Sequence, residues 1–280
     1  DAFDPDALLD LCEHRQITIL WGVPTMLSMM RDSPRFAEAT LASVRYAVVG
    51  GEAMPEPLIR TWQEKGVPIR QGFGMTEVGP NCFSLPEADA LRKIGSIGLP
   101  NMYVETRVVD DEGRDVPMGT PGELLMGGPV VTSGYWRHSE ATREAFDGPW
   151  FKTGDLVRVD DEGYFYVVGR KKDLFISGGE NVYPAEVERV LVAHDDVVAC
   201  AVVSAPHPRW GEVGVAYVVP ASGATLTPDD LLALAREQLA GYKVPHHVRF
   251  VDALPTGHSG KVLKTDLRHR IRSELAALSA

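Results

Sequence analysis

Residues 67–77 read Val67-Pro68-Ile69-Arg70-Gln71-Gly72-Phe73-Gly74-Met75-Thr76-Glu77. The first five predict a short buried strand, which runs into two glycines that flank an aromatic ring. Upstream, Ile17 to Leu20 and Val44 to Val49 predict two more strands, and Leu58 to Lys65 predicts a helix that ends at Gly66. Short apolar strands that alternate with helices and end in Gly-rich turns are typical of a parallel α/β sheet, whose ligands gather at the carboxyl ends of the strands.

The pattern changes at Ile94. Short strands are now separated by Gly, Pro and Asp turns, and two of these, Asp110 to Gly113 and Asp160 to Gly163, are nearly identical hairpin turns. This pattern predicts a small antiparallel subdomain. A polar break follows at Gly169-Arg170-Lys171-Lys172-Asp173, and the residues beyond it predict a compact α+β unit that closes with a helix from about Thr265.

The composition is that of an ordinary globular protein, with 280 residues of which 44% are hydrophobic and 24% charged. A net charge of −11 argues against nucleic-acid binding, which requires a basic face. Cys12, Cys82 and Cys200 are far apart in the sequence and form no zinc-binding pattern, so we expect reduced thiols in a cytoplasmic protein. No apolar run approaches the roughly 20 residues of a membrane-spanning helix.

Gly72 to Glu77 combines groups that suit a nucleotide. The glycines let the backbone approach a ligand closely, and the Phe73 ring can stack on a base. Thr76 can donate a hydrogen bond to a phosphate oxygen, and Glu77 can ligate magnesium. Taken alone, the same residues also fit a Gly-rich turn with a surface glutamate.

Three further segments carry polar groups suited to the same kind of ligand. Thr153-Gly154-Asp155 places a carboxylate after a predicted tight turn, where it can accept hydrogen bonds from a ribose diol. Gly169 to Asp173 contains a basic pair and leads to Ser177-Gly178-Gly179-Glu180-Asn181. Pro255 to Lys261 is a loop whose single lysine can stabilise charge on a phosphate. Singly, each fits an ordinary turn or a solvated surface as well.

In this order, the four segments resemble motifs of the adenylate-forming superfamily of acyl- and aryl-CoA synthetases, luciferases and nonribosomal-peptide adenylation domains. Gly72 to Glu77 resembles its Tyr-Gly-x-Thr-Glu motif, with Phe73 at the tyrosine position. Thr153 to Asp155 is similar to its ribose-binding motif, Gly169 to Asp173 to its hinge, and Pro255 to Lys261 to its terminal lysine motif. Ile176 to Glu186 and Ser133-Gly134-Tyr135-Trp136 resemble the fatty-acyl and aryl-CoA ligase branch.

The resemblance implies the domain organisation. Residues 1–170 are expected to be the remainder of a large N-terminal AMP-binding domain, with a parallel α/β sheet to about residue 93 and a small antiparallel β subdomain over about 94–170. A small, mobile α+β domain, residues 171–280, is expected to carry the lysine loop. The expected fold class is therefore α/β.

The resemblance also implies a role for each matching residue. The residues expected to bind the nucleotide are Gly51, Glu52, Ala53, Gly72, Phe73, Gly74, Thr76, Asp155 and Arg170. The expected catalytic residues are Lys261, Thr76 and Glu77, of which Glu77 is also the expected metal ligand. Lys172 is expected at the hinge, and the coenzyme A channel is expected beside Gly178 and Gly179. The expected acyl pocket is lined by Gly50, Gly74, Met75, Val78 and Gly79.

The implied reaction has two steps. A carboxylic acid attacks ATP to give an acyl-adenylate and pyrophosphate, and the thiol of coenzyme A displaces AMP after the small domain has rotated. ATP, Mg²⁺ and coenzyme A are thus the implied cofactors and co-substrate. The small or apolar pocket residues favour a fatty or aromatic acid, because no neighbouring cation could pair with a second carboxylate.

One family motif is absent, the Ser/Thr/Gly-rich phosphate loop that ends in Pro-Lys-Gly. Asp1 to Pro5 also contain neither an initiator Met nor a basic leader, so the sequence is expected to begin inside a longer chain. Two alternatives stay open: an adenylating enzyme that loads a carrier protein, and a non-catalytic fragment that acts as a binding module. The sequence predicts neither the acid nor the oligomeric state.

Overall fold

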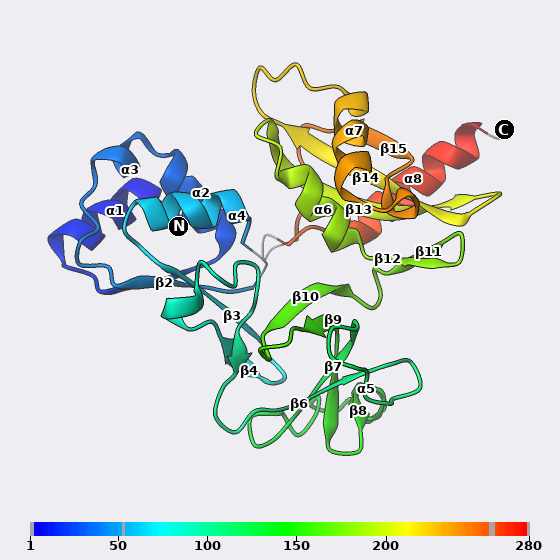
Figure 1. Cartoon of the computed structure of the whole chain (residues 1–280), viewed down its shortest axis with the longest axis horizontal. Coiled ribbons are helices and arrows are strands. Elements are labelled where there is room, and N and C mark those ends of the chain that lie inside the picture. Colours follow the sequence, from blue (N-terminus) through cyan, green and yellow to red (C-terminus); the bar gives the residue numbers. More distant parts are fainter. Residues whose placement is uncertain (1–2, 52–53, 258–260, 279–280) are drawn as a thin grey trace. The chain divides into compact units, whose positions relative to one another are not determined.

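The structure is a computed structural model that describes residues 3–51, 54–257 and 261–278 (Figure 1). The chain folds into two compact units, Asp1–Val167 and Val168–Ala280. The sequence placed the division after residue 170, and the functional assignment of the two parts stays a prediction. No helix in the described ranges is both long and apolar enough to span a membrane.

The first unit begins with an α/β layer built on one five-stranded sheet. Its strand order is β1-β2-β3-β4-β5. The first three strands are parallel, and the bounds of all five are β1 (Ile19–Gly22), β2 (Tyr46–Val49), β3 (Ile69–Met75), β4 (Gly79–Ser84) and β5 (Leu99–Pro100). The predicted parallel sheet is therefore confirmed. The antiparallel strands β4 and β5 extend it and were not predicted.

Four helices pack with β1–β3: α1 (Pro5–His14), α2 (Pro24–Asp32), α3 (Pro34–Glu38) and α4 (Glu56–Glu64). The start of α1 is set locally, because the Asp4 carboxylate accepts hydrogen bonds from the backbone N–H groups of Asp6 and Ala7. The helices bury an apolar stripe against the sheet, in a core that includes Leu9, Leu27, Ala47, Trp62 and Ile69. The indole N–H of Trp62 donates to the Leu27 carbonyl at 3.2 Å, so this large side chain is buried without an unpaired donor.

The second part of this unit is the predicted antiparallel sheet, with the strand order β10-β9-β7-β6. Its elements are β6 (Glu105–Val109), β7 (Gly122–Gly127), α5 (Ser139–Ala145), β8 (Phe146–Asp147), β9 (Trp150–Val159) and β10 (Phe165–Arg170). The two similar turns have the same geometry, because the carboxylates of Asp110 and Asp160 each accept two backbone N–H groups from their own turn.

One apolar cluster joins the two sheets of the first unit. It combines Val78 and Phe83 from the β3–β4 region with Leu124, Phe151 and Val157 from β7 and β9. The chain makes a close crossing at Gly98 (φ +90°), where an added Cβ would lie 2.0 Å from the Ser84 carbonyl oxygen. Only glycine fits this crossing.

The second unit is a small α+β domain with one five-stranded sheet. Its strands follow the order β12-β11-β14-β13, and β15 pairs with β14. The elements are β11 (Phe175–Ser177), β12 (Glu180–Val182), α6 (Pro184–Val192), β13 (Val197–His207), β14 (Gly211–Pro220), α7 (Pro228–Gln238), β15 (His247–Phe250) and α8 (Lys264–Leu278). The short 3₁₀ turns of the chain are Glu87–Asp89 and Gly241–Lys243.

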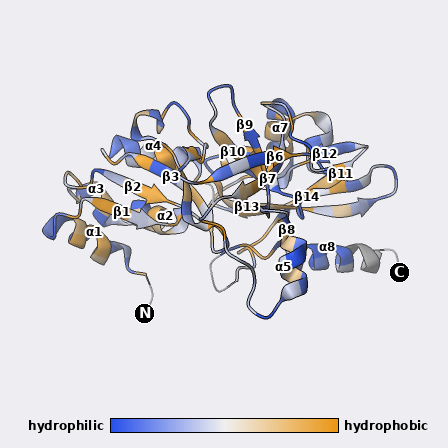
Figure 2. Ribbon diagram, turned by 90° about the horizontal axis from the view of Figure 1, so that it is seen from below, coloured by the Kyte–Doolittle hydropathy of each residue, from blue (hydrophilic) through white to orange (hydrophobic). Residues whose placement is uncertain are grey.

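The strands β13 and β14 bury both of their faces. Val202 packs with Val187, Leu191, Leu231 and Ala235, which come from α6 and α7. The next residue, Val203, faces the opposite side and packs with Leu267 and Ile271 of α8. Successive side chains of a strand point to opposite faces, so a nearly continuous apolar run is needed where both faces are covered. Apart from these two residues, α8 is hydrophilic from Lys264 to Glu274, as Figure 2 shows.

Candidate active site

The Gly72–Glu77 motif lies in and just after β3 of the first unit. The predicted strand end at Gln71 is wrong, because β3 continues through both glycines to Met75 and pairs antiparallel with β4. An added Cβ at Gly74 would lie 2.4 Å from the Gly79 carbonyl oxygen, and one at Gly72 would lie 2.5 Å from the side chain of Asn81. These glycines therefore let β4 approach, whatever ligand they also admit.

The Phe73 ring is partly buried at the edge of the cluster between the two sheets. It meets Phe83 edge to face, with 5.7 Å between the ring centroids. Met75 packs against the same cluster, and Val78 is completely buried within it. Of the residues predicted for the acyl pocket, Val78 thus belongs to the core of the unit. Gly79, with φ +93°, begins the returning strand.

Thr76 and Glu77 occupy the tight turn between β3 and β4. The Thr76 side chain is exposed, whereas Glu77 is held at two points by one neighbouring segment. The Tyr135 hydroxyl donates to Glu77 Oε1 at 3.0 Å, and the Thr132 N–H donates to the Glu77 carbonyl oxygen at 2.7 Å. The sequence singled out Ser133 to Trp136 only as a resemblance to one ligase branch, so the contact of Tyr135 with Glu77 was missed.

Asp155 lies inside the long strand β9 and is 3% exposed. The predicted tight turn before it is wrong. Gly154 instead has φ +69°, beside an irregularity of the β7–β9 pairing. The N–H of Asp155 donates to Thr153 Oγ1 at 3.1 Å, and this hydroxyl donates to the Leu124 carbonyl at 2.7 Å. The Gly154 N–H donates to the buried carboxylate of Glu123 at 3.3 Å. Glu123 therefore supports this segment, and no sequence pattern predicted this role.

Gly50 and Gly51 follow the carboxyl end of β2, and Gly51 has φ +91°. Glu52 and Ala53, also predicted to bind the nucleotide, lie outside the described residues. Just beyond them, the Met54 N–H approaches the amide oxygen of Gln71 at 3.5 Å. Gln71 is 4% exposed and precedes Gly72 directly. Its side chain thus links the segment after β2 to the Gly72–Glu77 motif.

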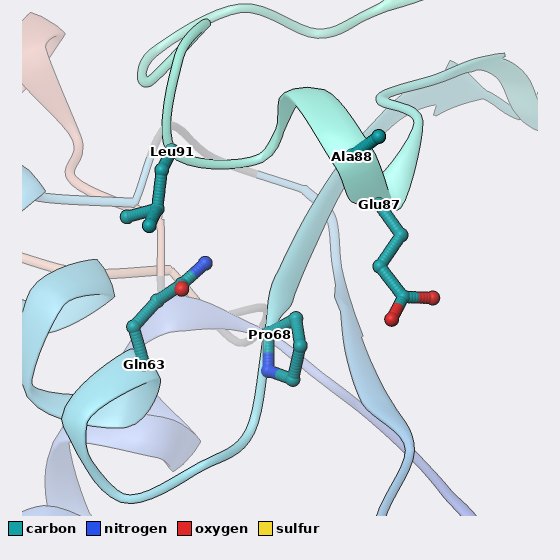
Figure 3. A pocket seen from close by; sticks show the side chains of 5 residues that line it. All are labelled: Gln63, Pro68, Glu87, Ala88 and Leu91. Carbon is teal, nitrogen blue, oxygen red and sulfur yellow. The ribbon is translucent and has the colours of Figure 1, made fainter.

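Figure 3 shows a surface depression of the first unit that lies elsewhere. It is lined by Gln63, Pro68, Glu87, Ala88 and Leu91. None of these is a predicted site residue, and the lining contains a single charged group, the Glu87 carboxylate. The depression therefore gives no support to a nucleotide site, and the motif residues remain the better candidates.

The predicted hinge belongs to the second unit. Arg170 is the last residue of β10, and its carbonyl oxygen accepts hydrogen bonds from the N–H groups of Asp173 and Leu174 at 3.0 and 3.1 Å. Lys172 is exposed within this turn. The Asp173 carboxylate is bonded to the guanidinium of Arg268, on α8, at 2.5 Å. The turn is thus anchored to its own unit directly after Lys172.

Gly178 and Gly179 form the two-residue turn between β11 and β12, in which Ser177 pairs with Glu180. Their φ angles are +61° and +92°, which favours glycine at both positions. An added Cβ at Gly178 would lie 2.9 Å from the Trp210 ring, whereas one at Gly179 would meet open space. The backbone conformation of the turn is therefore enough to explain both glycines, whether or not a coenzyme A channel lies beside them.

Lys261 is exposed in the segment that precedes α8. Its carbonyl oxygen accepts the Gly257 N–H at 2.9 Å, and the Leu263 N–H donates to Pro255 at 2.8 Å. A single antiparallel bridge joins Thr256 and Val262. The loop that these contacts close, residues 258–260, lies outside the described residues.

Glu77 is the residue that the sequence predicts as the metal ligand. Within the described ranges, no group of three or more His, Cys, Asp or Glu side chains is arranged to hold a metal ion. Magnesium in nucleotide sites is commonly bound by one or two carboxylates together with substrate phosphates. A single carboxylate in an accessible turn, with one oxygen fixed by Tyr135, fits that mode of binding.

Comparison with known proteins identifies the family. The "AMP-binding enzyme" family matches residues 1–136, and the "AMP-binding enzyme C-terminal domain" matches residues 186–261. A feruloyl-CoA synthase from an Amycolatopsis species is 47% identical over 269 residues, which are 96% of this chain and 55% of that protein. The chain spans about half the length of the curated relatives that it matches.

Solved structures agree in fold. The amide bond synthetase McbA from Marinactinospora thermotolerans superimposes with a TM-score of 0.90 at 34% identity, over 95% of this chain and 55% of that one. The o-succinylbenzoate CoA synthetase from Bacillus subtilis, in complex with its acyl-adenylate intermediate, gives a TM-score of 0.87 at 35% identity, over 95% of this chain and 54% of that one. The chain therefore belongs to the AMP-binding, adenylate-forming enzyme family.

Proposed function

We propose that this chain is part of an acyl-CoA ligase, which activates a carboxylic acid with ATP and transfers the acyl group to coenzyme A. The observation that carries the proposal is the match to a CoA synthetase whose structure contains an acyl-adenylate, over 95% of this chain. The feruloyl-CoA synthase supports the same reaction class. The adenylate intermediate has a clear chemical purpose: a carboxylate is a poor electrophile, whereas its acyl-adenylate carries a good leaving group, AMP, that a thiol can displace.

In the first half-reaction, the residues of the first unit bind and orient the nucleotide. Phe73, with Gly51, Gly72 and Gly74, is proposed beside the adenine, and the buried Asp155 carboxylate accepts hydrogen bonds from the ribose hydroxyls. Arg170, from the second unit, is proposed to serve the same hydroxyls. Thr76 donates to the α-phosphate and Glu77 holds Mg²⁺, which would neutralise phosphate charge. Lys261 supplies a further positive charge during adenylation.

In the second half-reaction, the thiol of coenzyme A attacks the adenylate. We propose that the small unit turns about Lys172 between the two steps, so that Lys261 leaves and the pantetheine passes beside Gly178 and Gly179. A hinge has a physical reason in this scheme, because Lys261 is needed for adenylation and must leave the site before the thiol can enter.

The acid is proposed to be fatty or aromatic. The residues assigned to the acyl pocket that lie outside the core, Gly50, Gly74, Met75 and Gly79, include no cation that could pair with a second carboxylate. Feruloyl-CoA synthase is the name of a relative with 47% identity, which favours the aromatic class. We place the enzyme in the cytoplasm, in keeping with the three free cysteines among the described residues.

Lys261→Ala tests the proposal in the full-length enzyme. Loss of the ammonium group is expected to reduce acid-dependent pyrophosphate exchange by about 100-fold or more, because it removes charge stabilisation from the adenylation step. Thioester formation from supplied acyl-adenylate should change little. Both rates are measured with the same enzyme preparation and a panel of fatty and aromatic acids.

Lys264→Ala is the matched control, because Lys264 lies close by in α8 but is paired with Glu188 of α6 at 2.7 Å. It should retain exchange if the enzyme stays folded. Equal loss of both half-reactions in Lys261→Ala would contradict the one-sided role of Lys261. Absence of acid-dependent exchange in the unmodified enzyme would contradict the ligase itself and favour the non-catalytic alternative.

The acceptor needs its own test, because the amide bond synthetase McbA has the same fold. Acyl transfer is compared for coenzyme A, a carrier protein that bears phosphopantetheine, and a simple amine. Preference for coenzyme A supports the proposal. Preference for the carrier would favour the alternative enzyme that shares the first half-reaction.

A further inference from the structure

We infer that Tyr135 is a positioning residue that fixes the Glu77 carboxylate for binding of the metal–nucleotide complex. The inference deepens the proposed function and rests on it. It starts from the bond of 3.0 Å between the Tyr135 hydroxyl and Glu77 Oε1. Tyr135 belongs to the segment Ser133-Gly134-Tyr135-Trp136, which has no other role in the proposed mechanism.

Glu77 is held at both its main chain and its side chain by the same short segment. The Thr132 N–H donates to the Glu77 carbonyl oxygen at 2.7 Å, and Tyr135 reaches the carboxylate. These are long-range contacts, since Glu77 lies in the turn after β3 and residues 132–135 precede α5. A glutamate in an accessible turn would otherwise sample several rotamers, so the two bonds restrict where its carboxylate can be.

Tyr135 is in turn held by α5. Its backbone N–H donates to Thr142 Oγ1 at 2.9 Å, and that hydroxyl donates to the His138 carbonyl at 2.9 Å. Gly134 allows this approach: its φ is +136°, and an added Cβ would lie 2.6 Å from the Thr142 side chain. The tyrosine is therefore supported by local structure and is not a loose surface group.

The chemistry of the contact suits a metal ligand. A carboxylate has two oxygens, and a phenol that donates to Oε1 leaves Oε2 free to face a cation. The phenol is neutral, so it orients the carboxylate without cancelling its negative charge. Partners that orient a ligand in this way typically change metal affinity by about 10- to 100-fold when they are removed.

Tyr135→Phe in the full-length enzyme tests the inference, because it removes the hydroxyl and keeps the ring. The Mg²⁺ concentration for half-maximal pyrophosphate release is expected to rise by about 10-fold. Binding of Mn²⁺ in the presence of a non-hydrolysable ATP analogue, followed by electron paramagnetic resonance, should weaken by a similar factor. Thioester formation from supplied acyl-adenylate should not change.

Tyr166→Phe is the matched control. Tyr166 also donates to a carboxylate, Asp160 Oδ2 at 3.2 Å, in the same unit, and its loss should leave the metal response unchanged. Tyr135→Phe with an unshifted metal response, or with equal loss of both half-reactions, would overturn the inference.

Glu77→Gln separates this inference from the proposed function. A shifted metal response in Glu77→Gln but not in Tyr135→Phe would reject the role of Tyr135 and leave the ligase proposal standing. An unshifted response in Glu77→Gln would reject the proposed metal role of Glu77, and with it the inference. When both variants shift, adding Tyr135→Phe to Glu77→Gln should cause no further change.

Discussion

Lys93 is a charged residue that the fold buries almost completely, at 8% exposure. Its ammonium lies 2.7 Å from Asp160 Oδ2 and 2.6 Å from Glu162 Oε1, in the second of the two similar turns. Burial by itself would raise the pKa of Asp160, but the hydrogen bonds from Lys93 and from the N–H groups of Tyr164 and Glu162 outweigh it and lower the pKa to about 2. The pair joins the loop before β5 to the β9–β10 turn.

A pH-dependent stability follows from the lowered pKa of Asp160. A carboxyl group whose pKa is lower in the folded state stabilises the fold above its unfolded pKa, near 3.8, and this contribution is lost as the pH falls towards about 2. Lys93→Met should lower the free energy of unfolding at pH 6, because it leaves the Asp160 carboxylate without its ammonium partner. The difference from the unmodified enzyme should shrink below pH 4 in urea unfolding. A difference that is independent of pH would contradict the ion-pair explanation.

Several elements were predictable because their signals are local. In the capping box of α7, the side chains of Thr227 and Asp230 accept each other's backbone N–H groups, and the two residues are only three positions apart. The Asp4 cap of α1 is equally local, because it involves Asp6 and Ala7. The bounds of β3 and β9 were missed because they depend on pairing with β4 and β7, residues distant in the sequence. Glycines suggested turns at Gly72 and Gly154, but Gly72 lies within β3 and Gly154 lies within β9, at an irregularity of its pairing with β7.

The β11–β12 hairpin supplies a test at the scale of one element. Gly179→Leu should destabilise the unit by roughly 1–2 kcal/mol, because a left-handed backbone is costly for a residue with a Cβ. Gly179→Asn should cost less, since asparagine tolerates this conformation. Both should raise the coenzyme A concentration needed for half-maximal thioester formation and leave pyrophosphate exchange unchanged. An unaltered coenzyme A response in Gly179→Asn would count against a channel at this turn.

At the scale of the whole molecule, the candidate residues are divided between the two units. Those for adenine, phosphate and metal lie in the first, and Arg170, Lys172, Gly178, Gly179 and Lys261 lie in the second. These positions were predicted from the order of the sequence motifs. The alternation of apolar and polar residues along the chain predicts strands and helices but not the positions of site residues. The sequence could not show that Tyr135 reaches Glu77 or that Glu123 reaches Gly154, because such contacts arise only when segments distant in the sequence come together in the fold.

The proposed hinge at Lys172 can be tested in the complete enzyme. Lys172→Pro fixes φ at this position, so it should spare adenylation and reduce thioester formation from acyl-adenylate by about 10-fold or more. Lys171→Ala is the control, because it alters the charge of the turn but not the freedom of residue 172. Rapid-quench measurement of each half-reaction gives both rates. Retention of both rates in Lys172→Pro would rule out a torsional role for this residue.

The bond between Asp173 and Arg268 has a mechanical consequence. Asp173 follows Lys172 directly, and Arg268 lies on α8, which begins at Lys264, just after Lys261. If Lys172 is the pivot that we propose, α8 would follow the turn that contains Asp173, because the ion pair ties the two together. The segment that carries Lys261 directly precedes this helix, so it would be displaced with α8 rather than independently of it.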